Sequence, residues 1–176
     1  MTKLKVSAPF SREIIKSLTS GLEVLMSGHI YTGRDAAHKR MISLLEEGKP
    51  LPFSVKDQVI YYAGPCPAPP GKVIGSVGPT TSQRMDVYAP RLIKEGLKIM
   101  IGKGHRSQLV IDAMQQHCGL YLAAVGGAGA LISLCVKKIE PVAFDDLGPE
   151  AIYRLTIKDM PLVVAIDCNG GNIYGR

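Results

Sequence analysis

Apolar residues along this chain fall alternately into strand-like runs and helical spacings. Strands are predicted at residues 3–9, 22–26, 57–63, 73–77, 97–101 and 120–125, with a break at 27–29. Helices are predicted from the N-cap Ser11 to Gly21, from the N-cap Asp35 to Gly48, over 85–95, and at the ends of segments 97–118 and 120–137.

Three segments repeat the order strand, glycine-containing loop, helix: 73–95, 97–118 and 120–137. Such alternation is typical of βαβ units with parallel strands, whose ligands bind beyond the carboxyl ends of the strands. Further strands are predicted at 140–144, 153–157 and 162–167, followed by a tight turn at 169–172. The pattern predicts one α/β domain over 1–176, in which a central α/β unit carries additional antiparallel strands.

The segment 78–86, GPTTSQRMD, places three consecutive hydroxyl residues and Arg84 between a predicted strand and a predicted helix. Hydroxyl groups at this position can cap the helix. They can also hold the oxygen atoms of an anion, while the guanidinium fork of Arg84 matches a carboxylate. A plain helix cap and an anion site both remain open from this segment alone.

Two other cations occupy similar positions. Arg34 directly precedes the helix that starts at Asp35, and Lys103 lies in the glycine-containing loop 102–107. If these loops converge, Arg34, Arg84 and Lys103 suit a dicarboxylate. For His38 and Arg40, in the first turns of the same helix, a solvated or structurally paired role is expected.

The charge balance favours small anions over nucleic acid. The net charge is +6, yet only 6% of the residues are aromatic and no basic cluster is interleaved with them. The apolar runs are too short to span a bilayer, and the N-terminus shows no secretory signal. The expected location is the cytoplasm.

The cysteines predict no metal site in this chain. Cys66, Cys118, Cys135 and Cys168 are far apart, without a CxxC pair. Cys118 and Cys135 are expected in the core, and Cys66 in an exposed proline loop at 64–70. The glycines at 126–129 and 102–104 lack the spacing of dinucleotide and P-loop motifs.

Several long motifs occur together in order and resemble one family. Segments 32–40 (TGRDAAHKR), 78–86 and 102–106 (GKGHR) are similar to the β-type domain of the iron–sulfur hydro-lyases. That family comprises class I fumarate hydratases and L(+)-tartrate dehydratases. The proline loop, segment 125–127 and segment 146–151 (DLGPEA) also resemble it, so the likeness covers nearly the whole chain.

The resemblance implies a swivelling β/β/α domain and a [4Fe–4S] cluster with one iron open to substrate. Three cysteines of a separate α-type domain would hold this cluster, so the four cysteines of this chain are not expected to be ligands. The chain is then expected to be a β subunit, active only with its α subunit in an α2β2 assembly.

The matching motifs also imply roles for single residues. Arg34, Arg84 and Lys103 would bind the substrate carboxylates, and Thr80 would be the catalytic group that takes the C3 proton of malate. The open iron would act as a Lewis acid on the departing hydroxyl. A positioning role for Thr80 remains open, and His105 and Arg106 are assigned at most a supporting role.

The expected reaction is the reversible hydration of fumarate to (S)-malate. Dehydration of L(+)-tartrate to oxaloacetate uses the same chemistry and remains an alternative. A non-catalytic anion-binding module is a third hypothesis, and nucleic-acid binding rests on the net charge alone.

Overall fold

The structure is a computed structural model that describes residues 2–125 and 127–175; Gly126, in the predicted opening of the fifth helix, lies outside them. The strands are β1 (Leu4–Ala8), β2 (Glu23–Thr32), β3 (Val59–Tyr61), β4 (Ile99–Gly102), β5 (Leu120–Ala123), β6 (Val136–Ala143) and β7 (Ile152–Ile166). The α-helices are α1 (Arg12–Ser17), α2 (Asp35–Glu46), α3 (Ala89–Lys94), α4 (Gln108–His117) and α5 (Gly129–Cys135), with 3-10 helices η1 (Ser82–Met85) and η2 (Asp145–Glu150).

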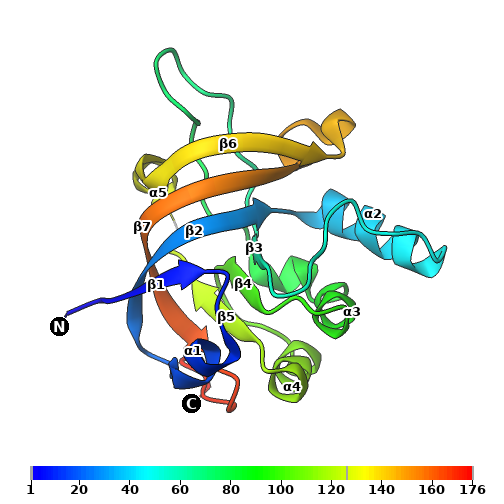
Figure 1. Cartoon of the computed structure of the whole chain (residues 1–176), viewed down its shortest axis with the longest axis vertical. Coiled ribbons are helices and arrows are strands. Elements are labelled where there is room, and N and C mark those ends of the chain that lie inside the picture. The colour runs from blue at the N-terminus through cyan, green and yellow to red at the C-terminus, as the bar shows by residue number, and fades with distance from the viewer. Residues whose placement is uncertain (1, 126, 176) are drawn as a thin grey trace.

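The seven strands form one sheet that partly closes on itself (Figure 1). Strands β1 to β5 run parallel to their neighbours, in the order β1-β2-β3-β4-β5. The long strand β7 pairs antiparallel with β5 and β6 along one edge and with β2 along the other. The predicted α/β class, with antiparallel strands added to a parallel centre, is confirmed.

Strands β3 to β5 are buried on both faces, which explains their continuous apolar runs. Alternate residues such as Val59, Ile99 and Leu120 point into one core, together with β1, β2, β7 and α1. The intervening Ile60 and Met100 point into a second core, which α2, α3 and α4 cover. These three helices lie together on one side of the sheet in Figure 1.

The predicted strand at 73–77 is wrong. The chain makes a long excursion after β3. The limb 73–77 bonds to the opposite limb through Cys66 N to Ser76 O (2.9 Å) and Gly75 N to Cys66 O (3.1 Å), and Val77 N donates to Gly129 O at 3.3 Å, but it joins no strand of the sheet. Prolines at 65 and 67 have no N–H and cannot extend a ladder. Ile74 and Val77 are nevertheless buried, so the apolar residues of this segment reflect packing against the core and not membership of the sheet.

Two further boundaries differ from the prediction. Strand β2 continues through the predicted break, because Gly28 takes φ +112° and its pairing with β7 shifts register between Met26 and Gly28, as in a β-bulge. The predicted helix 85–95 is divided into η1 and α3. Pro90 lacks the N–H that would bond to the carbonyl of Asp86, so an uninterrupted helix is excluded.

The C-terminal part holds fewer, longer strands than predicted. The predicted strands 153–157 and 162–167 are one strand, β7. Its pairing with β2 continues between the two predicted segments, where Pro161 lies opposite Leu25. Asp35 is likewise not the N-cap of α2: that position is Arg34, which makes no side-chain cap bond.

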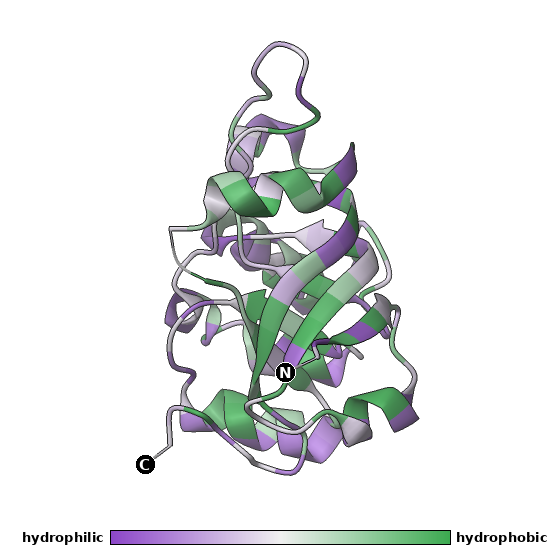
Figure 2. Ribbon diagram, turned by 90° about the vertical axis from the view of Figure 1, so that its left-hand side faces the viewer, coloured by the Kyte–Doolittle hydropathy of each residue, from purple (hydrophilic) through white to green (hydrophobic). Residues whose placement is uncertain are grey.

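One side of the molecule carries exposed apolar side chains. Figure 2 turns that side toward the viewer and shows hydrophobic positions along α5, below the projecting excursion. Leu131 and Leu134 are 68% and 62% exposed. None of the helices in the two described stretches is long and apolar enough to cross a membrane.

Candidate functional site

Three loops meet at the carboxyl ends of the adjacent parallel strands β2, β3 and β4. Arg34 follows β2 by two residues, and Lys103 follows β4 directly. The loop after β3 returns to the same edge at Thr80, whose N–H donates to the carbonyl of Tyr62 at 2.6 Å. The loops that carry the four predicted site residues are therefore neighbours, as the topology of a parallel sheet requires.

Hydrogen bonds tie the loop of Thr80 to the loop of Lys103. The N–H of Ser82 donates to the carbonyl of Lys103 at 2.9 Å, and Thr81 forms an isolated parallel bridge with Lys103. The Lys103 side chain is not part of any ion pair among the described residues.

A third connection joins the Thr80 loop to the start of α2. Arg84 Nε donates to Asp35 Oδ1 at 3.0 Å, and the Arg84 side chain is 53% exposed. The Nε atom of an arginine can be used in this way while its terminal amino groups remain available for a carboxylate. Asp35 thus orients Arg84, a role that sequence reasoning missed because it treated Asp35 as a helix cap.

Arg34 has a similar acidic neighbour. Its Nε lies 3.5 Å from Glu150 Oε1, at the end of η2. Arg34 Nε, Asp35 Oδ2 and His38 Nε2 are buried atoms without a hydrogen-bond partner in the described protein. Buried polar groups normally have partners, and of these three atoms Arg34 Nε has an ion-pair contact, with Glu150.

His38 is fully buried beneath Arg34. Its Nδ1–H donates to the Arg34 carbonyl at 2.8 Å, and its ring meets that of Tyr62 edge-on at 5.4 Å. Burial lowers the pKa of His38 from 6.5 to about 4, against the opposing effect of the Arg34 bond, so the ring is neutral at pH 7. Of the two roles expected, the structurally paired one is confirmed.

Three other residues considered above, Arg40, His105 and Arg106, contact other parts of the protein. Arg40 forms a two-pronged ion pair with Asp146, at 2.7 and 2.8 Å. His105 lies against the ring of Tyr174, with the centroids 4.7 Å apart. Arg106 is almost wholly buried and pairs with Asp86 at 2.7 Å.

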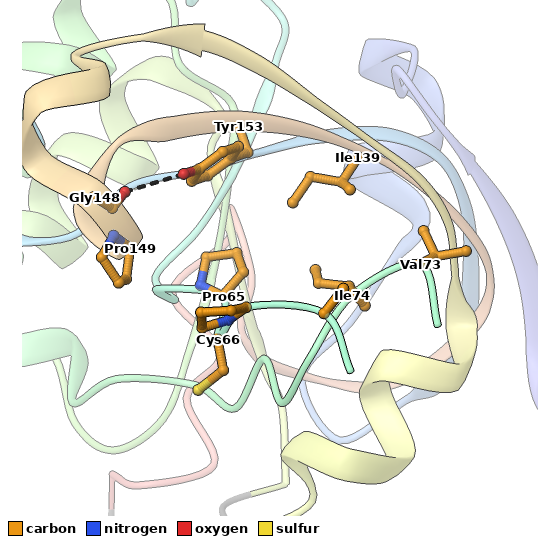
Figure 3. Close-up of a pocket in the computed structure, with 10 residues that line it drawn as sticks. Pro65, Cys66, Val73, Ile74, Ile139, Gly148, Pro149 and Tyr153 are labelled. Carbon is orange, nitrogen blue, oxygen red and sulfur yellow. Dashed lines mark hydrogen bonds between the residues drawn. The ribbon is translucent and has the colours of Figure 1, made fainter. Parts of the chain in front are cut away.

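A separate apolar cleft of about 370 Å³ lies beneath the excursion after β3. Figure 3 shows Tyr153 and Ile139 on one side of it and Pro65 and Ile74 on the other. Tyr153 uses its hydroxyl to donate to the carbonyl of Gly148 at 3.1 Å. Because none of the described residues that line this cleft is a cation, it does not suit a dicarboxylate, and the candidate anion site is the edge that carries Arg34, Arg84 and Lys103.

Candidate ligands for a metal cluster are the His, Cys, Asp and Glu side chains that the structure describes. Within residues 2–125 and 127–175, no three His, Cys, Asp or Glu side chains are grouped so that they could hold a metal ion. Cys118 and Cys168 are buried, Cys135 is half-buried and Cys66 is exposed. A cluster that acted at this site would need ligands from outside the described residues.

Comparison with known proteins identifies the family to which this chain is similar. The family described as "Fumarase C-terminus" matches residues 1–176. The anaerobic class I fumarate hydratase of Escherichia coli is 39% identical over 98% of this chain and 32% of its own length. Fumarate hydratase 2 of Leishmania major is 35% identical, over 94% of this chain and 29% of its own length. The chain thus spans about a third of these relatives.

A shorter relative matches over most of its length. The putative L(+)-tartrate dehydratase subunit beta of Methanocaldococcus jannaschii is 37% identical over 93% of this chain and 87% of its own length. The region shared with the longer relatives can therefore also occur as a protein named as a subunit.

Proposed function

This chain belongs to the fumarase C-terminus family, and we propose that it is the β subunit of a two-part hydro-lyase that hydrates fumarate to (S)-malate. One observation carries the proposal. Arg34, Arg84 and Lys103 lie on three loops at the carboxyl edge of β2, β3 and β4, and the loop of Thr80 and Arg84 bonds to both of the others. Two arginines and a lysine on one edge match the two carboxylates of a C4 acid.

The acidic neighbours support this assignment of the arginines. Asp35 and Glu150 approach the Nε side of Arg84 and Arg34 respectively. Binding through the terminal amino groups would then leave both ion pairs intact, and the hydrogen bond to Asp35 would hold the Arg84 guanidinium in place before substrate arrives. Such preorganisation reduces the entropy lost when the substrate is fixed.

Thr80 is proposed as the catalytic residue that this chain contributes. Its backbone is fixed by the bond to Tyr62, and its side chain is only partly buried. A threonine hydroxyl becomes a base only where nearby cations stabilise its alkoxide. Arg84, four residues later, and Lys103, on the bonded neighbouring loop, are the cations available for this effect.

The iron–sulfur cluster is assigned to an α subunit, because the described residues of this chain do not group as ligands. When bound there, the cluster supplies a Lewis acid for the departing hydroxyl. The name of the Methanocaldococcus relative, a subunit beta, supports a separate partner. An α2β2 assembly, a swivelling β/β/α domain over 1–176 and a cytoplasmic location complete the proposal.

The second candidate is the β subunit of an L(+)-tartrate dehydratase. Its support is the relative from Methanocaldococcus, which this chain matches along most of that protein's length. The decisive assay compares fumarate hydration with L(+)-tartrate dehydration by the anaerobic complex. Faster turnover of fumarate supports the first proposal, and faster turnover of tartrate supports the second.

The role of Thr80 can be tested against its neighbour. Thr80→Val removes the hydroxyl at nearly constant volume, and Thr81→Val does the same at an exposed position one residue later. Loss of a general base is expected to lower kcat about 100-fold or more, with Thr81→Val close to wild type. Unchanged turnover in Thr80→Val would favour the non-catalytic anion-binding module.

A further inference from the structure

A buried ion pair connects the two loops that carry Thr80, Arg84 and Lys103. Arg106 Nε donates to Asp86 Oδ1 at 2.7 Å, and their side chains are 0% and 9% exposed. Asp86 follows η1 directly, two residues after Arg84, whereas Arg106 lies three residues after Lys103. The second oxygen of Asp86 accepts the N–H of Ser107 at 2.5 Å, so this carboxylate bonds twice to the Lys103 loop.

Two tyrosines enclose the guanidinium and extend the connection. Arg106 lies between the rings of Tyr62 and Tyr121, at 5.2 and 4.9 Å from their centroids. Its Nη2 also donates to the Tyr62 hydroxyl at 3.2 Å. The backbone carbonyl of Tyr62 accepts the N–H of Thr80, so the residue that contacts Arg106 also fixes the proposed catalytic threonine.

Tyr121 makes a second link between the same loops. Its hydroxyl donates to the carbonyl of Gly104 at 2.9 Å and lies 2.8 Å from the Ser82 hydroxyl. Burial raises the pKa of Tyr121, so this hydroxyl keeps its proton at pH 7. At Gly102 a Cβ would collide with Ser82 Oγ, and the glycine therefore permits this close approach of the two loops.

The contacts of Asp86, Arg106 and Tyr121 indicate that these residues position the two loops rather than only stabilise the fold. Burying an ion pair is costly, and apolar replacements of similar volume are often as stable. The polar contacts of Asp86, Arg106 and Tyr121 named above nevertheless all reach one of the two loops or Tyr62, which fixes Thr80. Arg106 is too deeply buried to touch a substrate on the open edge.

We propose that Asp86 and Arg106 are positioning residues that fix the spacing between Lys103 and the pair Thr80 and Arg84. This inference rests on the function proposed above. The network sets where the cation on the β4 loop stands relative to the threonine and arginine of the neighbouring loop, without contacting substrate itself.

The test is the double variant Asp86→Asn/Arg106→Met, which removes both buried charges and leaves an acceptor for the Ser107 N–H. The matched control is Glu140→Gln/Arg154→Met, which removes another arginine–carboxylate pair, at 2.9 Å, between β6 and β7. Each is studied by thermal unfolding, by amide hydrogen exchange of the full chain, and by kcat and KM in the anaerobic complex.

We expect the double variant to fold and to keep the protection of its core strands. Amides at 80–84 and 103–107 should lose protection, and kcat should fall about 100-fold, as for groups displaced by about 1 Å. The control variant should match wild type in amide exchange and in kcat. A folded double variant with wild-type exchange and wild-type kcat would overturn the proposal.

Two further results keep this test decisive. If the double variant does not fold, Tyr121→Phe removes only the hydroxyl that links Ser82 and Gly104, and the same changes in exchange and kcat are expected in smaller degree. If the wild-type complex has no hydro-lyase activity, the proposed function fails, while wild-type exchange at 80–84 and 103–107 in the folded variants would separately refute the positioning network.

Discussion

Arg84 is a surface cation whose orientation is fixed by an ion pair. Its Nε is held by Asp35, at the start of a different element, and about half of its side chain is exposed to solvent. An exposed ion pair of this kind adds at most about 1 kcal/mol to stability. Its main consequence is the direction in which the terminal amino groups of Arg84 point.

Replacing Arg84 should therefore damage activity and spare the fold. For Arg84→Ala, the loss of two charge-assisted hydrogen bonds at about 1.5–3 kcal/mol each predicts at least about a 100-fold fall in kcat/KM. Arg91→Ala is the matched control, since Arg91 Nε on α3 also contacts a carboxylate, that of Glu95 directly after the helix, at 3.2 Å. Kinetics of the anaerobic complex, with circular dichroism, measure both effects; near-normal rates for Arg84→Ala would remove it from the site.

His38 predicts a pH dependence of stability. Its pKa falls from 6.5 to about 4 on folding, so the unfolded chain binds a proton more tightly. The contribution of His38 to the free energy of unfolding is complete above pH 6.5. It is lost as the pH falls toward 4, at about 1.4 kcal/mol per pH unit and about 3 kcal/mol in total.

Urea unfolding between pH 4 and 7.5 measures this effect. The variant His38→Asn keeps a side-chain N–H for the Arg34 carbonyl but cannot titrate, so its free energy of unfolding should fall less steeply with acid than that of wild type. Parallel curves for the two proteins would show that His38 does not titrate between the folded and unfolded states.

Sequence patterns identified these residues more readily than their partners. The cations were recognisable because each stands in a glycine-containing or hydroxyl-rich loop. Local spacing carried no information on the pairs Arg84 with Asp35, or Arg106 with Asp86, because the partners are 49 and 20 residues apart. The burial of His38 likewise depends on Tyr62, which only the folded sheet brings near.

At the scale of elements, the sequence predicted those strands that are buried on both faces. The runs of β3, β4 and β5 lie between two cores, and continuous apolar runs are typical of such strands. The limb 73–77 has a similar composition but packs without joining the sheet, and β7 continues through Pro161, a residue that usually ends a strand. Whether each of these two segments is a strand depends on its pairing partners, which composition does not reveal.

The substitution Gly28→Ala, compared with Gly21→Ala, tests why β2 continues through its predicted break. An added Cβ would collide with the carbonyl of Ala8 on β1, and φ is +112°. Gly21 has a similar φ of +92° but open space around it. Backbone strain alone should cost Gly21→Ala about 1–2 kcal/mol, and the collision should cost Gly28→Ala about 1–3 kcal/mol more.

Chemical unfolding of the two glycine variants checks this difference. Equal losses in the free energy of unfolding would show that the approach of β1 to β2 at Gly28 relaxes freely, and that the bulge depends on backbone conformation alone.

On the scale of the whole molecule, the sheet brings three distant loops to one open edge. The parallel order of β2, β3 and β4 follows from the chain's alternation of strands and helices, and it places Arg34, Thr80 and Lys103 at neighbouring strand ends. The edge carries three cations, and among the described residues no three His, Cys, Asp or Glu side chains group so that they could hold a metal ion. Such a half-site suits a protein whose chemistry is completed by a partner.

The most direct test of this account is fumarate hydration measured anaerobically with this chain, with a reconstituted iron–sulfur α subunit, and with both together. The account predicts turnover only in the mixture, and no cluster on this chain after reconstitution alone. A stoichiometric cluster bound by this chain alone, or a formed complex with an intact cluster that converts neither fumarate nor tartrate, would contradict it.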